Sequence, residues 1–176
     1  ITVGFTELNS VEHYIIHQVS GVNLNSLPES DQAKEPLPQY AIDSEMQWQF
    51  QSPEQLGRGV NEVLVEPELV QALARVNQEI EANPNLADEV IHKLRAILLS
   101  VNQVGLVKAN EEFFLWLTGE KTMPFGENNR HVPVSLIDFD NLTNNNYIVT
   151  NQFRIHHRET KIPDVVMMIN GIPVVV

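Results

Sequence analysis

The chain has 176 residues and no cysteine, so its length suits one folded domain, and disulfides and thiolate metal sites are excluded. Hydrophobic residues make up 43% and charged residues 19%, values typical of a globular protein, and no apolar run approaches the about 18 residues that a membrane span requires. The net charge of −12 argues against a surface that grips nucleic acid by itself, because nonspecific affinity for phosphates comes mostly from Lys and Arg.

These features fit a soluble cytoplasmic protein that has no contact with a membrane. The opening ITVGFTELNS has neither an initiator Met nor the basic and apolar regions of a signal peptide. We therefore expect the natural protein to begin earlier, with this start produced by trimming or disorder.

The first expected element is an amphipathic helix over residues 7–20. Apolar side chains recur there at the spacing of one helical face, and Gly21 is placed to end the helix. Over residues 22–59 the composition turns to Pro, Ser, Gln and acidic residues, with Trp48 and Phe50 as the only strong apolar anchors. This composition predicts a long irregular polar excursion.

Residues 60–118 are dominated by helical periodicity, and three apolar stripes predict three helices. Asn83-Pro84-Asn85 separates the first helix from the second. Asn110 is placed to cap the third helix, and Gly119 follows it. Whether this helical segment packs onto a sheet or forms a separate lobe is left open by the sequence. The stripes consist of Leu69, Leu73 and Val76, then Val90, Leu94, Ile97, Leu98 and Val101, then Phe113, Phe114, Trp116 and Leu117.

Residues 127–176 carry short runs of strand-forming residues and are expected to form a β-rich core. The pair Asn170-Gly171 lies between two apolar runs, which predicts a two-residue type I′ hairpin because both turn positions require positive φ. The hairpin strands are apolar on both faces, so we expect a sheet that is covered by helices. The predicted class is α/β or α+β, in one domain over residues 1–176. The runs are HVPVSLIDF, NYIVTNQFRI, PDVVMMI and IPVVV.

Asp164 is the first candidate for chemistry, because it follows Pro163 and opens a strand that is otherwise apolar. In one interpretation it is an ordinary strand-end carboxylate that is solvated or bonded to a loop amide. In the other it is a metal ligand, since Mg²⁺-dependent phosphodiester cleavage needs closely spaced carboxylates that fix the ion and orient water. The residues alone leave both interpretations open.

The hairpin geometry predicts where a second ligand would lie. Pairing outward from the turn matches Ile169 with Ile172 and Val165 with Val176. Asp164 then faces the first residue after Val176. A second acidic ligand on the neighbouring strand is therefore expected one or two residues beyond Val176, with allowance for a bulge.

The stretch NYIVTNQFRIHHRETKIPDVVMMINGIPVVV resembles the nuclease domain of type I restriction enzyme R subunits. In that family an Asp after Pro starts a strand, an Asn-Gly turn follows, and the next strand carries a Glu-x-Lys pair. The resemblance continues through LVKANEEFFLWLTGE, VPVSLIDFDNLTNNNYIV and TELNSVEHYI, so it covers nearly the whole chain except the polar excursion. It implies a PD-(D/E)xK nuclease with a restriction-endonuclease-like mixed sheet, flanked by helices and carrying a helical insertion.

This sequence departs from the family pattern at one point, because no Glu-x-Lys pair follows Asp164 within the 176 residues. The resemblance therefore implies an incomplete nuclease domain that ends just before this motif. Such a fragment is expected to be inactive alone.

By the same resemblance, Asp164 is a catalytic carboxylate and a Mg²⁺ ligand. A Glu on the first helix assists metal or water positioning in such nucleases, and either Glu7 or Glu12 matches it here. Glu12 lies nearer the centre of the apolar stripe and is slightly favoured over Glu7, although each is equally well explained as a solvated helix carboxylate. Gln152, in the family-like NQF segment, is a weaker candidate for contact with DNA, since a structural side-chain hydrogen bond explains it better.

The resemblance also implies partners. Double-stranded DNA is the expected substrate, and the methyltransferase and specificity subunits of the restriction complex are the expected protein partners. ATP is expected to act only through motor domains outside this chain, which drive translocation along DNA.

The alternative is a noncatalytic acidic module, either a docking domain for partner subunits or a DNA mimic. Its main support is the net charge of −12. A mimic should display its carboxylates in a repeated array, whereas these acids are scattered between apolar stripes. Glu-x-Lys directly after Val176 in the gene would favour the nuclease, and a stop codon there would favour the module.

Overall fold

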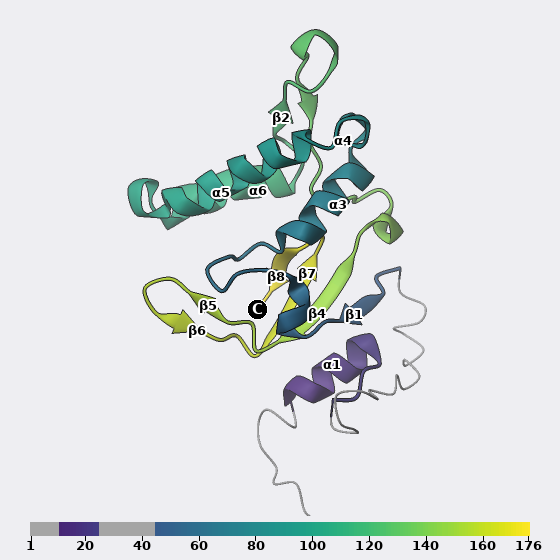
Figure 1. The fold of residues 1–176 in the computed structure, drawn as a ribbon, viewed down its shortest axis with the longest axis vertical. Helices are drawn as coiled ribbons and strands as arrows, with labels where there is room; N and C mark the ends of the chain where they lie inside the picture. The colour runs from purple at the N-terminus through teal and green to yellow at the C-terminus, as the bar shows by residue number, and fades with distance from the viewer. Residues whose placement is uncertain (1–10, 25–44) are drawn as a thin grey trace, which may run out of the picture. The chain divides into compact units, whose positions relative to one another are not determined.

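The computed structural model describes residues 11–24 and 45–176, and these residues divide into two compact units (Figure 1). The sheet unit contains the described residues up to Val65 and those from Asn146 onward. The helical unit is Glu66–Asn145, and it enters the sequence between two strands of the sheet. The predicted mixture of helices and a sheet, with a helical insertion, is confirmed.

The sheet unit is built on a mixed four-stranded sheet in the order β1-β4-β7-β8. β1 (Trp48–Phe50) runs parallel to β4 (Tyr147–Asn151). β7 (Val165–Ile169) is antiparallel both to β4 and to β8 (Ile172–Val175). Among the described strands β1 and β8 are the edges, so β4 and β7, which begins directly after Asp164, lie in the middle of the sheet.

Both faces of the sheet are covered by apolar side chains. One face packs against α1 (His13–Ser20), whose Ile16 is buried against Val149. On the other face, Val166 and Met168 are buried with apolar residues of the loops and of the 3-10 helix η2 (Pro53–Leu56). Successive side chains of β7 point to opposite faces, which produces the two layers. The expected burial on both sides is therefore present, although an α-helix covers only the first face within the described sheet unit.

The first predicted helix ends where the sequence indicates. Gly21 has a φ of 72°, and its N–H donates to the carbonyl of His17 at 2.9 Å. A glycine in this left-handed conformation is the usual way to close a helix. The expected beginning of the helix, including Glu7, lies outside the described residues.

The predicted hairpin between β7 and β8 is present. Asn170 and Gly171 have φ values of 53° and 79°, as a type I′ turn requires, and Ile169 pairs with Ile172. The side chain of Asn170 also accepts a hydrogen bond from the main-chain N–H of Asn146 at 2.8 Å, which fastens the turn to the start of β4.

The pairing predicted for Val165 and Val176 is wrong, because β8 carries a bulge. Met168 pairs with Pro173, and Met167 pairs with Val175, so one extra residue of β8 lies between these pairs. Proline has no N–H to donate to a ladder, and it is found at edges and bulges for this reason. The register of β8 is therefore shifted by one residue relative to the prediction.

The irregular excursion predicted over residues 22–59 contains regular structure near its end, since β1 and η2 both lie there. The ring of Trp48 packs against that of Tyr147 in β4, with centroids 5.3 Å apart. Composition missed β1 because the strand has three residues and pairs with a strand that is distant in the sequence. Residues 25–44 of the excursion lie outside the described part of the chain.

The helical unit contains four helices where three were predicted. The additional helix is α4, which has five residues. The third predicted helix begins at Leu106 and not after Asn110, because Gly105 turns the chain sharply with a φ of 87°. No helix within the described ranges is both long and apolar enough to cross a membrane. The four helices are α3 (Glu66–Val76), α4 (Gln78–Ala82), α5 (Leu86–Val104) and α6 (Leu106–Leu117).

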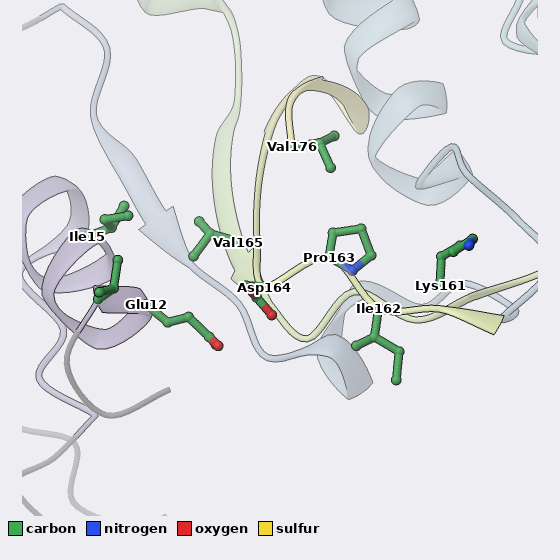
Figure 2. Close-up of a pocket in the computed structure, with 9 residues that line it drawn as sticks. Glu12, Ile15, Lys161, Ile162, Pro163, Asp164, Val165 and Val176 are labelled. Atoms are coloured by element: carbon green, nitrogen blue, oxygen red, sulfur yellow. The ribbon is translucent and has the colours of Figure 1, made fainter. Parts of the chain in front are cut away.

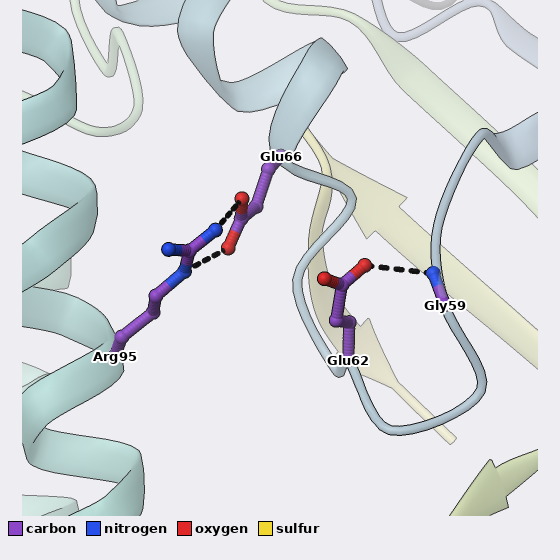
Figure 3. Close-up of polar contacts among 4 residues, drawn as sticks. All are labelled: Gly59, Glu62, Glu66 and Arg95. Atoms are coloured by element: carbon purple, nitrogen blue, oxygen red, sulfur yellow. Dashed lines mark hydrogen bonds and ion pairs between the residues drawn. The ribbon is translucent and has the colours of Figure 1, made fainter.

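A bidentate ion pair joins α5 to the start of α3. Arg95 donates through Nε and Nη2 to the two carboxylate oxygens of Glu66, as Figure 3 shows. The Arg95 side chain is 54% exposed, so solvent screens the pair and we expect it to contribute at most about 1 kcal/mol.

The predicted strand HVPVSLIDF is wrong except at its start. Only β3 (Val132–Pro133) is a strand there, and it pairs with β2 (Thr122–Met123). The chain around β3 forms short 3-10 turns, η3 (Glu127–Asn129) and η4 (Leu142–Asn144).

Side-chain amides take the place of a neighbouring strand after β3. The amide of Asn77 exchanges two hydrogen bonds with the main chain of Ser135, each 2.8 Å long. The amide of Asn145 does the same with the main chain of Asp138, at 2.9 and 2.8 Å. The main-chain groups of Ser135 and Asp138 are thus satisfied without a strand partner, which explains the failed prediction.

The carboxylate of Asp138 organises the turn before η4. It accepts hydrogen bonds from the side chain of Asn144 at 2.9 Å and from the main-chain N–H groups of Asn141 and Asp140 at 2.8 and 3.1 Å. The Asn144 bond, and then the Asn141 bond, hold the pKa of Asp138 below its usual value.

We expect Asn77→Ala to destabilise the helical unit by about 1–3 kcal/mol, because it leaves main-chain groups of Ser135 without their partners. The measurement is urea unfolding, followed by the fluorescence of the buried Trp116 in a Trp48→Phe background. Asn102→Ala, on an exposed position of α5, is the control and should change the free energy of unfolding by less than about 0.5 kcal/mol. Equal unfolding midpoints for the two variants would contradict the role assigned to Asn77.

Candidate functional site

A cavity of about 510 Å³ lies in the sheet unit where the start of α1 faces the segment that leads into β7 (Figure 2). Three of its lining residues carry charge: Glu12, Asp164 and Lys161. The other lining residues are apolar and include Val165 of β7 and Val176. The cavity therefore combines an apolar wall with two carboxylates and one amine.

Asp164 is positioned by an extension of the pairing between β4 and β7. The N–H of Gln152 donates to the carbonyl of Asp164, and the N–H of Phe153 donates to the carbonyl of Pro163, both at 3.1 Å. The carboxylate itself is exposed, and no hydrogen bond or ion pair engages it within the part of the chain that the structure describes. The backbone of Asp164 is thus held while its side chain is available for a ligand.

Glu12 directly precedes α1, and its side chain lines the cavity. Only 5% of Glu12 is exposed, and its two carboxylate oxygens accept hydrogen bonds from Gln152 Nε2 at 3.1 and 3.0 Å. No cationic side chain pairs with Glu12 among the residues in the two described ranges. Burying a carboxylate beside a neutral donor alone is unfavourable, so this position favours the arrival of a cation.

Figure 2 shows the carboxylates of Glu12 and Asp164 directed toward the same space. Two of the candidate residues are thus brought together, while Glu7 lies outside the described residues. Carboxylate oxygens are preferred ligands of hard cations such as Mg²⁺, whereas zinc prefers nitrogen and sulfur ligands. The described residues contain no group of three or more His, Cys, Asp or Glu side chains that could hold an ion.

Gln152 makes the structural side-chain hydrogen bond that the sequence interpretation favoured over contact with DNA. Its amide is bonded to Glu12. The sequence offered no sign of the partner, because Glu12 lies near the opposite end of the chain.

Arg58 contacts Phe153 and Arg154, which follow Gln152 in the chain. No pattern in the sequence indicated this role. Its guanidinium lies over the Phe153 ring, 3.5 Å from the centroid, and donates to the carbonyl of Arg154 at 2.7 Å. It also donates to the carbonyls of Glu62 and Gly59, at 2.7 and 3.1 Å, and the Glu62 carboxylate accepts from the Gly59 N–H (Figure 3). Burial lowers the pKa of Arg58, and the nearby charge of Glu62 opposes this shift.

We expect Arg58→Lys to lower the free energy of unfolding by about 1–3 kcal/mol. The planar guanidinium donates to three carbonyls and stacks on the Phe153 ring, and an ammonium group cannot make all of these contacts. Thermal unfolding of the chain measures the change. Arg158→Lys, at an exposed position, is the control and should leave the unfolding temperature unchanged. An Arg58→Lys protein as stable as the control would show that the Arg58 contacts do not support the sheet unit.

Comparison with known proteins identifies the family. The family "Type I restriction enzyme R protein N terminus" matches residues 27–176. One similar protein is the putative type I restriction enzyme MjaIXP endonuclease subunit of Methanocaldococcus jannaschii, 29% identical over 100 residues, which are 53% of this chain and 10% of that protein. Another is the type I restriction enzyme HindI endonuclease subunit of Haemophilus influenzae, 28% identical over 98 residues, which are 53% of this chain and 9% of that protein.

No solved structure matches this chain. The chain spans about a tenth of the length of the two relatives. The family match, in contrast, covers the whole of the strand, turn and strand around Asp164 and most of the rest of the sequence. The chain therefore belongs to the family of the type I restriction enzyme R protein N terminus.

Proposed function

We propose that this chain supplies part of a Mg²⁺-dependent DNA-cleaving centre in the R subunit of a type I restriction enzyme. The observation that carries the proposal is the convergence of Glu12 and Asp164 on one cavity at the entrance to β7. Glu12 is buried without a cationic partner in the described part of the chain, and Asp164 carries a carboxylate that nothing described engages. Both features are suited to a bound cation.

In this proposal Asp164 binds the ion directly, and Glu12 binds it or orients a water molecule beside it. The bound Mg²⁺ would neutralise charge that develops on the scissile phosphate and favour attack by water. Burial of Glu12 would restrict water around its carboxylate, which strengthens its interaction with a cation. Lys161, on the same cavity, pairs with Glu159 at 3.2 Å on the exposed surface and would exchange this partner for a phosphate oxygen.

A second acidic ligand would come from the extension of β8. Met167 pairs with Val175 after the bulge, so continued pairing would set the second residue beyond Val176 opposite Asp164. The Glu-x-Lys pair of the family is expected at this place. Without it we expect the present residues to hold metal weakly and not to cut DNA.

The ribbon of β5 (Ile155–His156) and β6 (Thr160–Lys161) is the candidate surface for the DNA backbone. Arg154, Arg158 and Lys161 lie within eight residues of sequence and are all exposed, whereas the whole chain contains only 11 Lys and Arg. The ribbon leaves β4 and leads directly to Asp164. A phosphate backbone that follows these cations would therefore pass close to the two carboxylates despite the net charge of −12.

The remaining parts of the proposal depend on family membership alone. We propose that the complete protein works in the cytoplasm with methyltransferase and specificity subunits, and that the specificity subunit recognises the DNA sequence. We further propose that ATP is consumed by motor domains elsewhere in the protein to drive translocation before cleavage.

We expect Asp164→Ala in the full-length protein, assembled with its partner subunits, to reduce Mg²⁺-dependent DNA cleavage to the background of the assay. ATP-driven translocation should remain, because Asp164 belongs to the cleavage site alone. Plasmid cleavage and triplex displacement measure the two activities on the same preparation. Asp140→Ala, an exposed carboxylate of the helical unit, is the matched control and should retain both. Cleavage by the Asp164 variant at the control rate would reject the assignment.

We expect the double variant Arg154→Ala/Arg158→Ala to weaken DNA binding and to reduce its dependence on salt. If each Arg neutralises one phosphate, the slope of log affinity against log salt should fall in magnitude by about 1.8. Fluorescence anisotropy of a labelled duplex at several salt concentrations gives this slope. The exposed pair Lys108→Ala/Arg130→Ala in the helical unit removes the same charge and should leave the slope unchanged. Equal slopes for both double variants would exclude the ribbon as the DNA surface.

A further inference from the structure

We infer that Gln152 is a positioning residue that holds Glu12 and Asp164 at the separation a shared cation needs. Its main-chain N–H donates to the carbonyl of Asp164 at 3.1 Å, and its side-chain amide donates to both oxygens of Glu12 at 3.1 and 3.0 Å. One residue thus links the backbone of one carboxylate to the side chain of the other. The inference rests on the proposed function, because it concerns the geometry of that metal site.

The backbone of Gln152 supports a dedicated role. Its φ is 49°, in the left-handed region that residues with a Cβ rarely adopt. Gln152 directly follows β4, whose side chains alternate between the two faces of the sheet. The change in the sign of φ interrupts that alternation and allows the amide to reach Glu12. Unfavourable conformations of this kind persist where surrounding contacts hold them, and they are concentrated at functional sites.

The chemistry of an amide also suits this role. A carboxylate oxygen has two lone pairs, so each Glu12 oxygen that accepts a bond from Gln152 keeps capacity for a cation or a water molecule. An amide is neutral and leaves the negative charge of Glu12 intact. An Arg or Lys at this position would orient Glu12 equally well but would neutralise the charge that attracts the metal.

Two variants distinguish a role of Gln152 in positioning Glu12 from a role in folding alone. Gln152→Gly removes the side-chain amide, and glycine adopts the positive φ without strain. If Gln152 were needed only for folding, this variant would bind metal as tightly as wild type. Gln152→Asn keeps an amide and a residue type that tolerates positive φ, but its side chain is one methylene shorter and cannot span the same distance to Glu12. The second variant keeps the test valid if the glycine protein is poorly folded.

The experiment measures Mn²⁺ binding by electron paramagnetic resonance in the full-length protein, together with its unfolding temperature. We expect both Gln152 variants to bind Mn²⁺ at this site about tenfold or more weakly than wild type, as is usual when a group that orients a metal ligand is lost. We also expect Gln152→Asn to unfold at the wild-type temperature. The Mg²⁺ concentration for half-maximal DNA cleavage should rise by the same factor.

Asp164→Ala distinguishes failure of this inference from failure of the proposed function. If wild type and Asp164→Ala bind Mn²⁺ equally, the cavity is no metal site and the proposed function fails together with the inference. If Asp164→Ala loses binding while both Gln152 variants bind like wild type, only the inference is overturned. It is also overturned if the loss of affinity in the Gln152 variants follows a matching loss of thermal stability.

Discussion

Five consecutive residue pairs join β4 to β7, and this antiparallel pairing decides where the polar groups of the sheet unit lie. Its last pair is Asn151 with Val165, so the next residues along each strand, Gln152 and Asp164, leave the sheet at the same end. At the other end, the turn at Asn170 is bonded back to Asn146. A shift of one residue in this register would exchange the two faces of β7 and separate Gln152 from Asp164.

The apolar side chains of the same two strands stabilise the sheet unit, whereas the end of the sheet near Glu12 and Asp164 carries unfavourably placed charge. Ile148, Val149, Val166 and Met168 are all at most 1% exposed, and burial of each such side chain contributes about 1.5–3 kcal/mol. Against this gain stands Glu12, a carboxylate withdrawn from water with a neutral amide as its donor. Glu12 is not a member of either apolar cluster of the sheet, so these clusters can offset its unfavourable burial. Sites of this kind commonly reduce the stability of a protein in order to bind a ligand.

Local signals allowed several features to be predicted from the sequence. The Asn170-Gly171 turn, the helix end at Gly21 and the position of Asp164 before an apolar strand each depend on a few adjacent residues. The failures depend on contacts between distant residues. β1 is defined by its pairing with β4, and the run after β3 is held by the side chain of Asn77. The side-chain hydrogen bond favoured for Gln152 is present, but its partner Glu12 comes from the start of the chain and no local pattern identifies it.

The central claim is that Asp164 and Glu12 share one divalent cation, and anomalous diffraction from crystals of the full-length protein soaked in Mn²⁺ tests it most directly. The account predicts a peak in the cavity of Figure 2, about 2.0–2.6 Å from an Asp164 oxygen and joined to Glu12 directly or through one water molecule. A map in which both carboxylates are well ordered and no peak lies between them, or in which Mn²⁺ is held by other residues, would contradict the account.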